Sequence, residues 1–192
     1  MSKKIAVIGS GFSSLSAACY LAQAGNDVTI YEKNDTVGGR ARRLIKDGFT
    51  FDIGPSWYWM PDIFERFFAD FGKKPSDYYQ LDKLSPAYTV VFKDETIEIG
   101  DNLETIKNTF ERIEPGSSKP LQQFIDKAEE NYEIAIKNLV YRPGESPLEL
   151  VTPQTAKKVG AFLSNVSRDV RKKFTNPKLV SILEFPVLFL GA

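Results

Sequence analysis

The stretch IAVIGSGFSSLSAACYLAQAG, residues 5–25, decides the fold that we expect for this chain. An apolar run over residues 4–8 predicts a β-strand, and residues 13–24 carry apolar side chains at helical spacing. A second apolar run at residues 27–31 predicts another strand. Strand, glycine-rich turn, helix and strand in this order form a βαβ unit, which binds dinucleotides in Rossmann-like folds.

The turn carries two of the three glycines of the dinucleotide-binding pattern. Gly9 and Gly11 stand where a tight turn and a close approach of backbone to pyrophosphate require glycine. Ser14 occupies the third position, and its small side chain permits close helix packing at modest cost. Because the start of a helix attracts phosphates, we predict a phosphate-binding loop formed by Gly9, Gly11, Phe12, Ser13 and Ser14.

Glu32 lies 21 residues after Gly11, directly after the second predicted strand. A carboxylate at this point can accept hydrogen bonds from ribose hydroxyls, and we include the adjacent Lys33 in the candidate site. A glycine turn followed by a surface glutamate is the simpler alternative. The register of strand, glycines, helix, strand and acid favours dinucleotide binding.

Composition excludes several classes of function. The chain has 192 residues, 42 % of them hydrophobic, and its 25 basic and 25 acidic side chains leave no net charge. We expect a packed core and no nucleic-acid partner, because nucleic-acid binding requires concentrated positive charge. The absence of histidine removes Ser/His and Cys/His pairs and histidine-ligated zinc, so we expect no metal site. A single cysteine and a start without a signal-peptide pattern indicate the cytoplasm.

The residue pattern of the sequence changes near residue 75. The later segments predict strands over 88–92 and 96–99 and helices over 119–140 and 154–175. The expected fold class is α/β, with an incomplete Rossmann-like βαβ unit in residues 1–74 and a mainly helical α+β domain in residues 75–192. No third strand that returns to the first sheet is evident after residue 35, so we expect the amino-terminal portion of a longer enzyme.

Several segments resemble one family. GSGFSSL, YEKNDTVGGRA and FDIGPSWYWMPD are similar to amino-terminal motifs of the flavoprotein amine oxidase and carotenoid desaturase superfamily, most closely the bacterial phytoene desaturases. FADFG, LVYRPGESP and NPKLVSILEFPVLFLGA resemble the helical region of that family, so the resemblance covers the whole chain. It implies that the dinucleotide is FAD, with its pyrophosphate over the first loop and its adenosine ribose on Glu32.

The resemblance also extends the candidate site along the chain. A second glycine pair, Gly38 and Gly39, precedes Arg40, which the family places along the FAD, and a planar guanidinium suits phosphate oxygens. A solvated turn of charged side chains is the alternative, and it suits Arg42 and Arg43 better than Arg40.

Gly54, Pro55 and Ser56 are expected to bring backbone close to the flavin end of the cofactor. The aromatic run of residues 57–59 that follows has two interpretations. It either lines an apolar substrate tunnel or packs in the core, and the usual burial of Trp and Tyr favours the core.

The activity implied by the resemblance is FAD-dependent desaturation of phytoene toward lycopene in carotenoid biosynthesis. A hydrocarbon offers no polar handle, so the cofactor must take the hydride, while a neighbouring proton leaves to complete the double bond. We assign no proton acceptor. Another carotenoid desaturase, a ketolase or an amine oxidase would share the first motifs, and an inactive fragment or a non-catalytic binding module is the third possibility.

An apolar substrate implies a protein attached peripherally to the inner face of the cell membrane. The apolar run 179–190 is too short to span a bilayer and contains Glu184 and Pro186. Residues 154–175, with the basic triplet at 171–173, are candidates for contact with the membrane surface, and a solvated charged end is the alternative.

Overall fold

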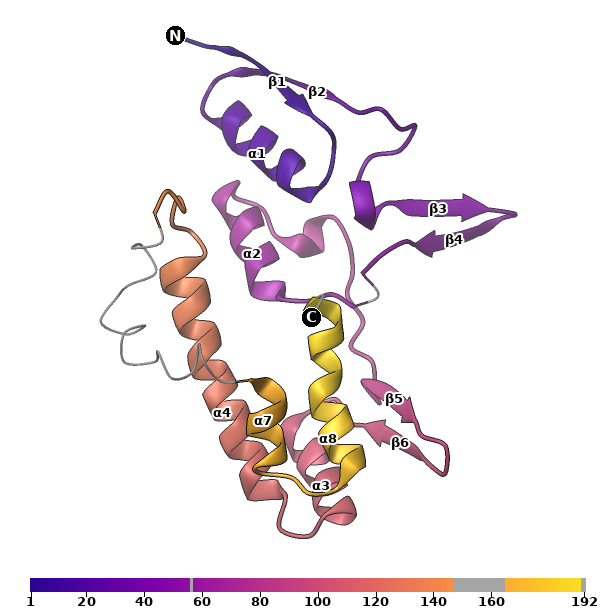
Figure 1. The fold of residues 1–192 in the computed structure, drawn as a ribbon. Helices are drawn as coiled ribbons and strands as arrows, with labels where there is room; N and C mark the ends of the chain where they lie inside the picture. Colours follow the sequence, from indigo (N-terminus) through magenta and orange to yellow (C-terminus); the bar gives the residue numbers. More distant parts are fainter. Residues whose placement is uncertain (56, 147–164, 191–192) are drawn as a thin grey trace. The chain divides into compact units, whose positions relative to one another are not determined.

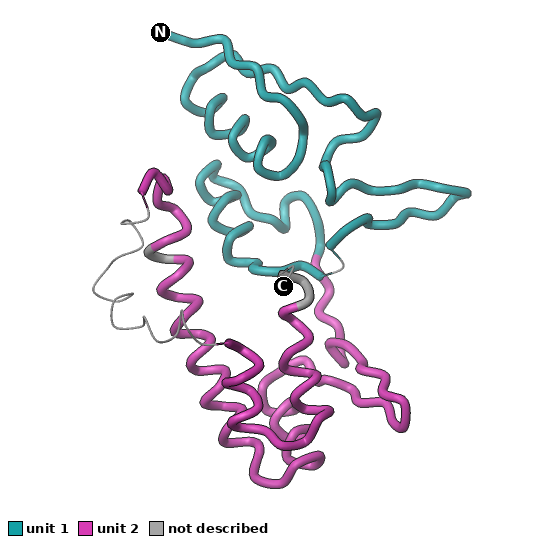
Figure 2. The backbone as a smooth tube through the Cα atoms, viewed as in Figure 1, with its two compact units in different colours: residues 1–80 teal, residues 81–192 magenta. Residues whose placement is uncertain are grey.

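The computed structural model describes residues 1–55, 57–146 and 165–190. The chain divides into two compact units, Met1–Gln80 and Leu81–Ala192 (Figure 2). The domain boundary that we predict from the sequence lies near residue 75, a few residues earlier.

The first unit opens with the predicted βαβ arrangement. Strand β1 (Lys4–Ile8) pairs in parallel with β2 (Asp27–Tyr31), and helix α1 (Phe12–Gln23) connects them (Figure 1). Gly25 ends the helix with φ +83°, a left-handed conformation that suits glycine after a helix. The prediction of strand, helix and strand is confirmed, with each helix end shifted by one residue. Within the described residues the parallel sheet has two strands.

A β-hairpin follows that was not predicted from the sequence. A short 3₁₀ turn at Gly39–Ala41 leads into β3 (Arg43–Lys46), which pairs with the antiparallel β4 (Phe49–Asp52). Asp47 and Gly48 form the two-residue turn, with φ +52° and +82°. The Asp-Gly pair is a standard hairpin signal, because both central residues of this turn need positive φ.

Helix α2 (Pro61–Asp70) packs against α1 through aromatic rings. The ring of Tyr20 lies 5.8 Å from that of Phe67, and the Tyr20 hydroxyl donates to Asp70 at 2.6 Å. Tyr58 packs 4.6 Å from the ring of Phe64 but remains 36 % exposed, so the core interpretation of the aromatic run is wrong for this residue. Trp59 departs from that interpretation, because half of its surface is exposed.

The second unit combines a hairpin with helices. Strand β5 (Tyr88–Val91) pairs antiparallel with β6 (Thr96–Ile99), and helix α3 (Leu103–Ile113) follows. Helix α4 (Ser118–Ile134) continues as a π-helical segment over Ala135–Leu139, so the helix predicted over 119–140 is confirmed. Among the described residues of this unit, the core contains nine buried apolar side chains: Ile97, Ile99, Phe110, Leu121, Val170, Phe174, Leu179, Val180 and Ile182.

The helix predicted over 154–175 is wrong in its last residues. Residues 154–164 lie outside the described part of the chain, and helix α7 (Val166–Arg171) ends four residues before Thr175. A new helix, α8 (Pro177–Glu184), begins at a proline, and a residue before proline disfavours helical backbone. The Glu114 carboxylate also accepts hydrogen bonds from the backbone N–H groups of Thr175 and Asn176. These bonds stabilise the non-helical loop between the two helices.

The apolar run at 179–190 folds as α8 followed by a 3₁₀ segment over Phe185–Leu190. Across the described residues, no helix combines the length and apolar character that crossing a bilayer requires.

Candidate dinucleotide-binding site

The loop between β1 and α1 has the geometry of an anion-binding turn. Gly9 has φ +91°, and its N–H donates to the carbonyl of Tyr31 at 2.7 Å, which ties the loop to the end of β2. Gly11 is the N-cap of α1 and has no capping side chain. The first N–H groups of a helix have no intrahelical partner, so the amides of Phe12, Ser13 and Ser14 remain for a ligand.

Gly11 differs from the other glycines of the site. Its φ of −71° is open to any residue, and a β-carbon there would meet nothing within 4 Å. Neither backbone strain nor packing within the described residues therefore requires a glycine at this position. The free space over the start of α1 fits a pyrophosphate, which needs close approach to the backbone.

Ser14 fits the position of the missing third glycine. It is half-buried and lies one helical turn before the buried Ala18, on the same face of α1. Its hydroxyl oxygen lies 4.0 Å from the place that a β-carbon on Gly9 would take, which is an ordinary contact. The serine therefore does not disturb the loop.

The second glycine pair meets the first loop. The N–H of Gly38 donates to the carbonyl of Ser10 at 2.9 Å. A β-carbon on Gly39 would make a tight contact of 3.1 Å with the α-carbon of Gly11, and Gly39 has φ +60°, so both the close approach and the backbone conformation favour glycine. Two segments about 30 residues apart in the sequence thus form one surface.

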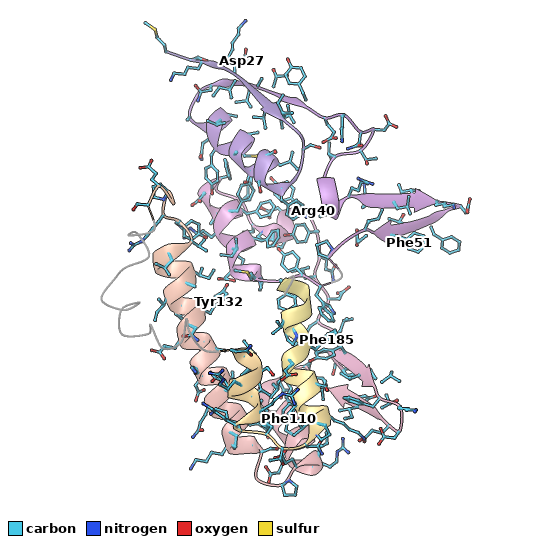
Figure 3. The ribbon with its side chains drawn as sticks, in the orientation of Figure 1. Asp27, Arg40, Phe51, Phe110, Tyr132 and Phe185 are labelled. Carbon is cyan, nitrogen blue, oxygen red and sulfur yellow. The ribbon has the colours of Figure 1, made fainter. Side chains whose placement is uncertain are left out.

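The third glycine segment joins the same cluster. Gly54 has φ +105°, and a β-carbon there would lie only 2.2 Å from the carbonyl oxygen of Arg40. Arg40 lies where the loop enters the β3–β4 hairpin, and Figure 3 labels it together with Phe51 on β4. Within the described residues, no hydrogen bond or ion pair engages the exposed Arg40 side chain. Pro55 follows Gly54, and Ser56 lies outside the described residues.

Glu32 stands at the end of β2, beside the loop. Its Oε2 accepts the N–H of Ser10 at 2.9 Å and the Ser10 hydroxyl at 2.6 Å. Its Oε1 accepts the backbone N–H of Asn34 at 2.9 Å and the Asn34 side-chain amide at 2.6 Å. The Ser10 hydroxyl is the largest of the influences that lower the pKa of Glu32 to about 2, followed by the backbone N–H of Asn34. The carboxylate is therefore ionised and held in place. The Lys33 side chain is exposed.

Ser10 and Asn34 were not predicted from the sequence as site residues. Ser10 is the variable residue between two glycines, and no spacing rule predicts that its buried side chain reaches Glu32. Asn34 carries a weak signal, because Asn side chains often bond to nearby polar groups in turns.

Residues 7–73 match a family profile described as an NAD(P)-binding Rossmann-like domain. The chain is 44 % identical over 191 residues to the carotenoid 3,4-desaturase of Haloarcula japonica, covering 97 % of this chain and 39 % of that protein. The chain belongs to the carotenoid desaturase family and matches its amino-terminal part.

Other family members are similar over the same extent. The 4,4′-diapophytoene desaturases of Staphylococcus haemolyticus and Staphylococcus aureus are 35 % and 37 % identical over 97 % and 98 % of this chain, and the chain covers 38 % of each. It thus spans well under half the length of these relatives. A solved putrescine oxidase with redesigned cofactor binding superposes with a TM-score of 0.55 at 19 % identity, covering 96 % of this chain and 36 % of that chain, which shows a shared fold.

The family assignment supports FAD as the cofactor. The residues present fit such a group, because the space at Gly11, the open helix start and the ionised Glu32 suit a dinucleotide.

Proposed function

We propose that this chain forms the FAD-binding part of a carotenoid desaturase. The observation that carries the proposal is Gly11, a glycine in an ordinary conformation whose missing side chain opens into free space. A ligand that must approach the backbone at that point explains the glycine, and a pyrophosphate is such a ligand.

Each candidate residue has a role in this proposal. The amides of Phe12, Ser13 and Ser14 and the positive end of α1 hold the pyrophosphate, and the free guanidinium of Arg40 neutralises it. Glu32 accepts a ribose hydroxyl, and Lys33 lies at the edge of the adenosine site.

The remaining glycines shape the rest of the site. Gly9 ties the first loop to the end of β2, Gly38 and Gly39 hold the two loops together, and we propose that Gly54, Pro55 and Ser56 border the flavin end. FAD supplies the two-electron oxidising chemistry that protein side chains lack.

The substrate class follows from the relatives. Their names, carotenoid 3,4-desaturase and 4,4′-diapophytoene desaturase, describe different carotenoid substrates and different bonds. Within that class we propose conversion of phytoene toward lycopene by the whole enzyme, at the inner face of the cell membrane. An uncharged hydrocarbon needs orientation and exclusion of water more than acid–base residues, which agrees with a sequence that contains no histidine.

The test uses the full-length protein that contains this chain. It is expressed in cells that accumulate phytoene and, separately, in cells that accumulate 4,4′-diapophytoene, and the pigments and the membrane pellet are examined. We expect bound flavin, coloured products from phytoene and enzyme in the membrane fraction. Colour only from diapophytoene would correct the substrate, and oxidation of amines without any pigment would overturn the proposal. A purified protein that takes up no FAD would exclude the cofactor role.

A further inference from the structure

Glu32 is fully hydrogen-bonded before any ligand arrives. A carboxylate offers about four lone-pair positions. Ser10 and Asn34 each donate from a backbone N–H and from a side chain, so four donors surround the two oxygens. If Glu32 is to accept a ribose hydroxyl, one of these donors must leave or share its acceptor.

The donors on Oε2 are held in place. Ser10 is 1 % exposed, and its hydroxyl would lose its partner in a buried place if it left Glu32, which is costly. Its backbone is fixed as well, because its carbonyl accepts the N–H of Gly38 at 2.9 Å. Oε2 is therefore closed to a ligand.

The side-chain donor on Oε1 is free to move. Asn34 is exposed, so its amide can exchange Glu32 for water at little cost, while its backbone N–H keeps its bond to Oε1. The causes of the low Glu32 pKa follow the same order, with the Ser10 hydroxyl the largest and the Asn34 side chain the smallest.

We propose that Ser10 is a positioning residue that locks Oε2 of Glu32, and that the Asn34 side-chain amide is an exchangeable donor that leaves Oε1 when a ribose hydroxyl arrives. The inference rests on the proposed FAD function and assigns roles to two residues whose identity the glycine pattern does not specify. Ser10 orients the Glu32 carboxylate for the ligand, whereas the Asn34 side chain only occupies the acceptor position until the ribose hydroxyl replaces it.

The test titrates the 192-residue chain with ADP, which carries the adenosine ribose and the pyrophosphate, and with 2′-deoxy-ADP, using calorimetry. Ser10→Ala should weaken ADP binding by roughly tenfold, because the carboxylate is no longer held. Asn34→Ala should change the Kd by less than about threefold, in either direction, because only an exposed and exchangeable bond is lost. The penalty for the missing 2′-hydroxyl should persist in Asn34→Ala and shrink in Ser10→Ala.

Two further variants separate these roles from folding. Ser16→Ala removes a hydroxyl of α1 that donates to the Ser13 carbonyl at 3.2 Å, and it should bind ADP as the natural chain does. Ser10→Cys keeps the connectivity of the side chain with a slightly larger atom that is only a weak donor, so it should resemble Ser10→Ala in binding if the fold is retained. The Glu32 pKa, measured by NMR without ligand, should rise clearly in Ser10→Ala and little in Asn34→Ala.

Equal losses in the Ser10 and Asn34 variants, or a larger loss in Asn34→Ala, would overturn the assigned roles while leaving the proposed function intact. A natural chain that binds neither ADP nor FAD would overturn the proposed function and this inference together.

Discussion

Gly11→Ala should separate cofactor binding from folding. Position 11 has φ −71°, and the added methyl group would meet nothing within 4 Å, so the folded chain accepts it without strain. Alanine is a poorer N-cap than glycine, at a cost of about 0.5–1 kcal/mol. The smaller conformational freedom of the unfolded chain offsets this by about 0.4–1 kcal/mol. The free energy of unfolding should therefore change by less than about 0.5 kcal/mol.

The effect on the ligand should be much larger. The methyl group enters the space proposed for the pyrophosphate, and overpacking of a close contact costs about 1–3 kcal/mol. This corresponds to a rise in the Kd for ADP or FAD of roughly 5- to 150-fold. Gly11→Val should abolish binding, because its branched side chain takes up more of that space.

Urea unfolding and ligand titration of the same preparations measure both effects. Gly54→Ala is the matched control, because it places a methyl group 2.2 Å from the Arg40 carbonyl at φ +105°. That variant should lose at least about 1–3 kcal/mol of stability from backbone strain alone. If Gly11→Ala unfolded the chain, the inference that a side chain fits at this position would be wrong. If the variant bound FAD normally, the ligand would not occupy that space.

Three other variants test separate parts of the structure. Ser14→Gly should alter the Kd for FAD by no more than about threefold, because the position needs only a small residue; a large gain in affinity would mean that Ser14 impairs the loop. Glu32→Gln should make the free energy of unfolding less sensitive to acid. The lowered Glu32 pKa gives the natural chain stability that is complete above pH 4.5 and is lost as the pH falls toward about 2. The stability difference between the natural chain and the variant should therefore shrink over that window. A difference that stays constant from pH 7 to pH 3 in urea titrations would contradict the ionised, hydrogen-bonded carboxylate. Phe110→Ala should destabilise the second unit by about 3–5 kcal/mol, because this ring is 1 % exposed and packs 5.9 Å from that of Phe174; a loss below about 1 kcal/mol would show that the site collapses around the cavity.

Local patterns predicted the first βαβ unit and the long helix because their signals lie within short windows. The strands at Lys4–Ile8 and Asp27–Tyr31 and the helix between them need only hydrophobic spacing and glycine positions. The β3–β4 hairpin also had local signals, in Asp47–Gly48 and in the alternating FTFD of β4, but each strand has only four residues and all of them are exposed, so no buried face reinforces the pattern. The break after α7 was signalled by Asn176–Pro177.

Contacts between distant residues could not be predicted in this way. Glu114 holds the backbone of Thr175 across 61 positions, and the Ser10 hydroxyl reaches Glu32 across 22. Both depend on side-chain rotamers that the completed fold selects. The meeting of Gly39 with Gly11 and of Gly54 with Arg40 is likewise a backbone approach between separate turns, which the spacing of glycines in the sequence does not determine.

The glycines of the site divide by what requires them, and this explains why the pattern tolerates Ser14. Gly9 and Gly54 have positive φ, and Gly39 touches another backbone, so the chain itself demands them. Among these glycines, only Gly11 is required neither by its backbone conformation nor by a contact with another backbone, and we propose that the ligand requires a glycine there. The third position of the pattern belongs to the first kind, since it serves packing of the helix against the strand, and Ser14 has a small, half-buried side chain that suits this packing. A substitution there changes a contact within the protein, whereas a substitution at Gly11 changes the space left for the cofactor.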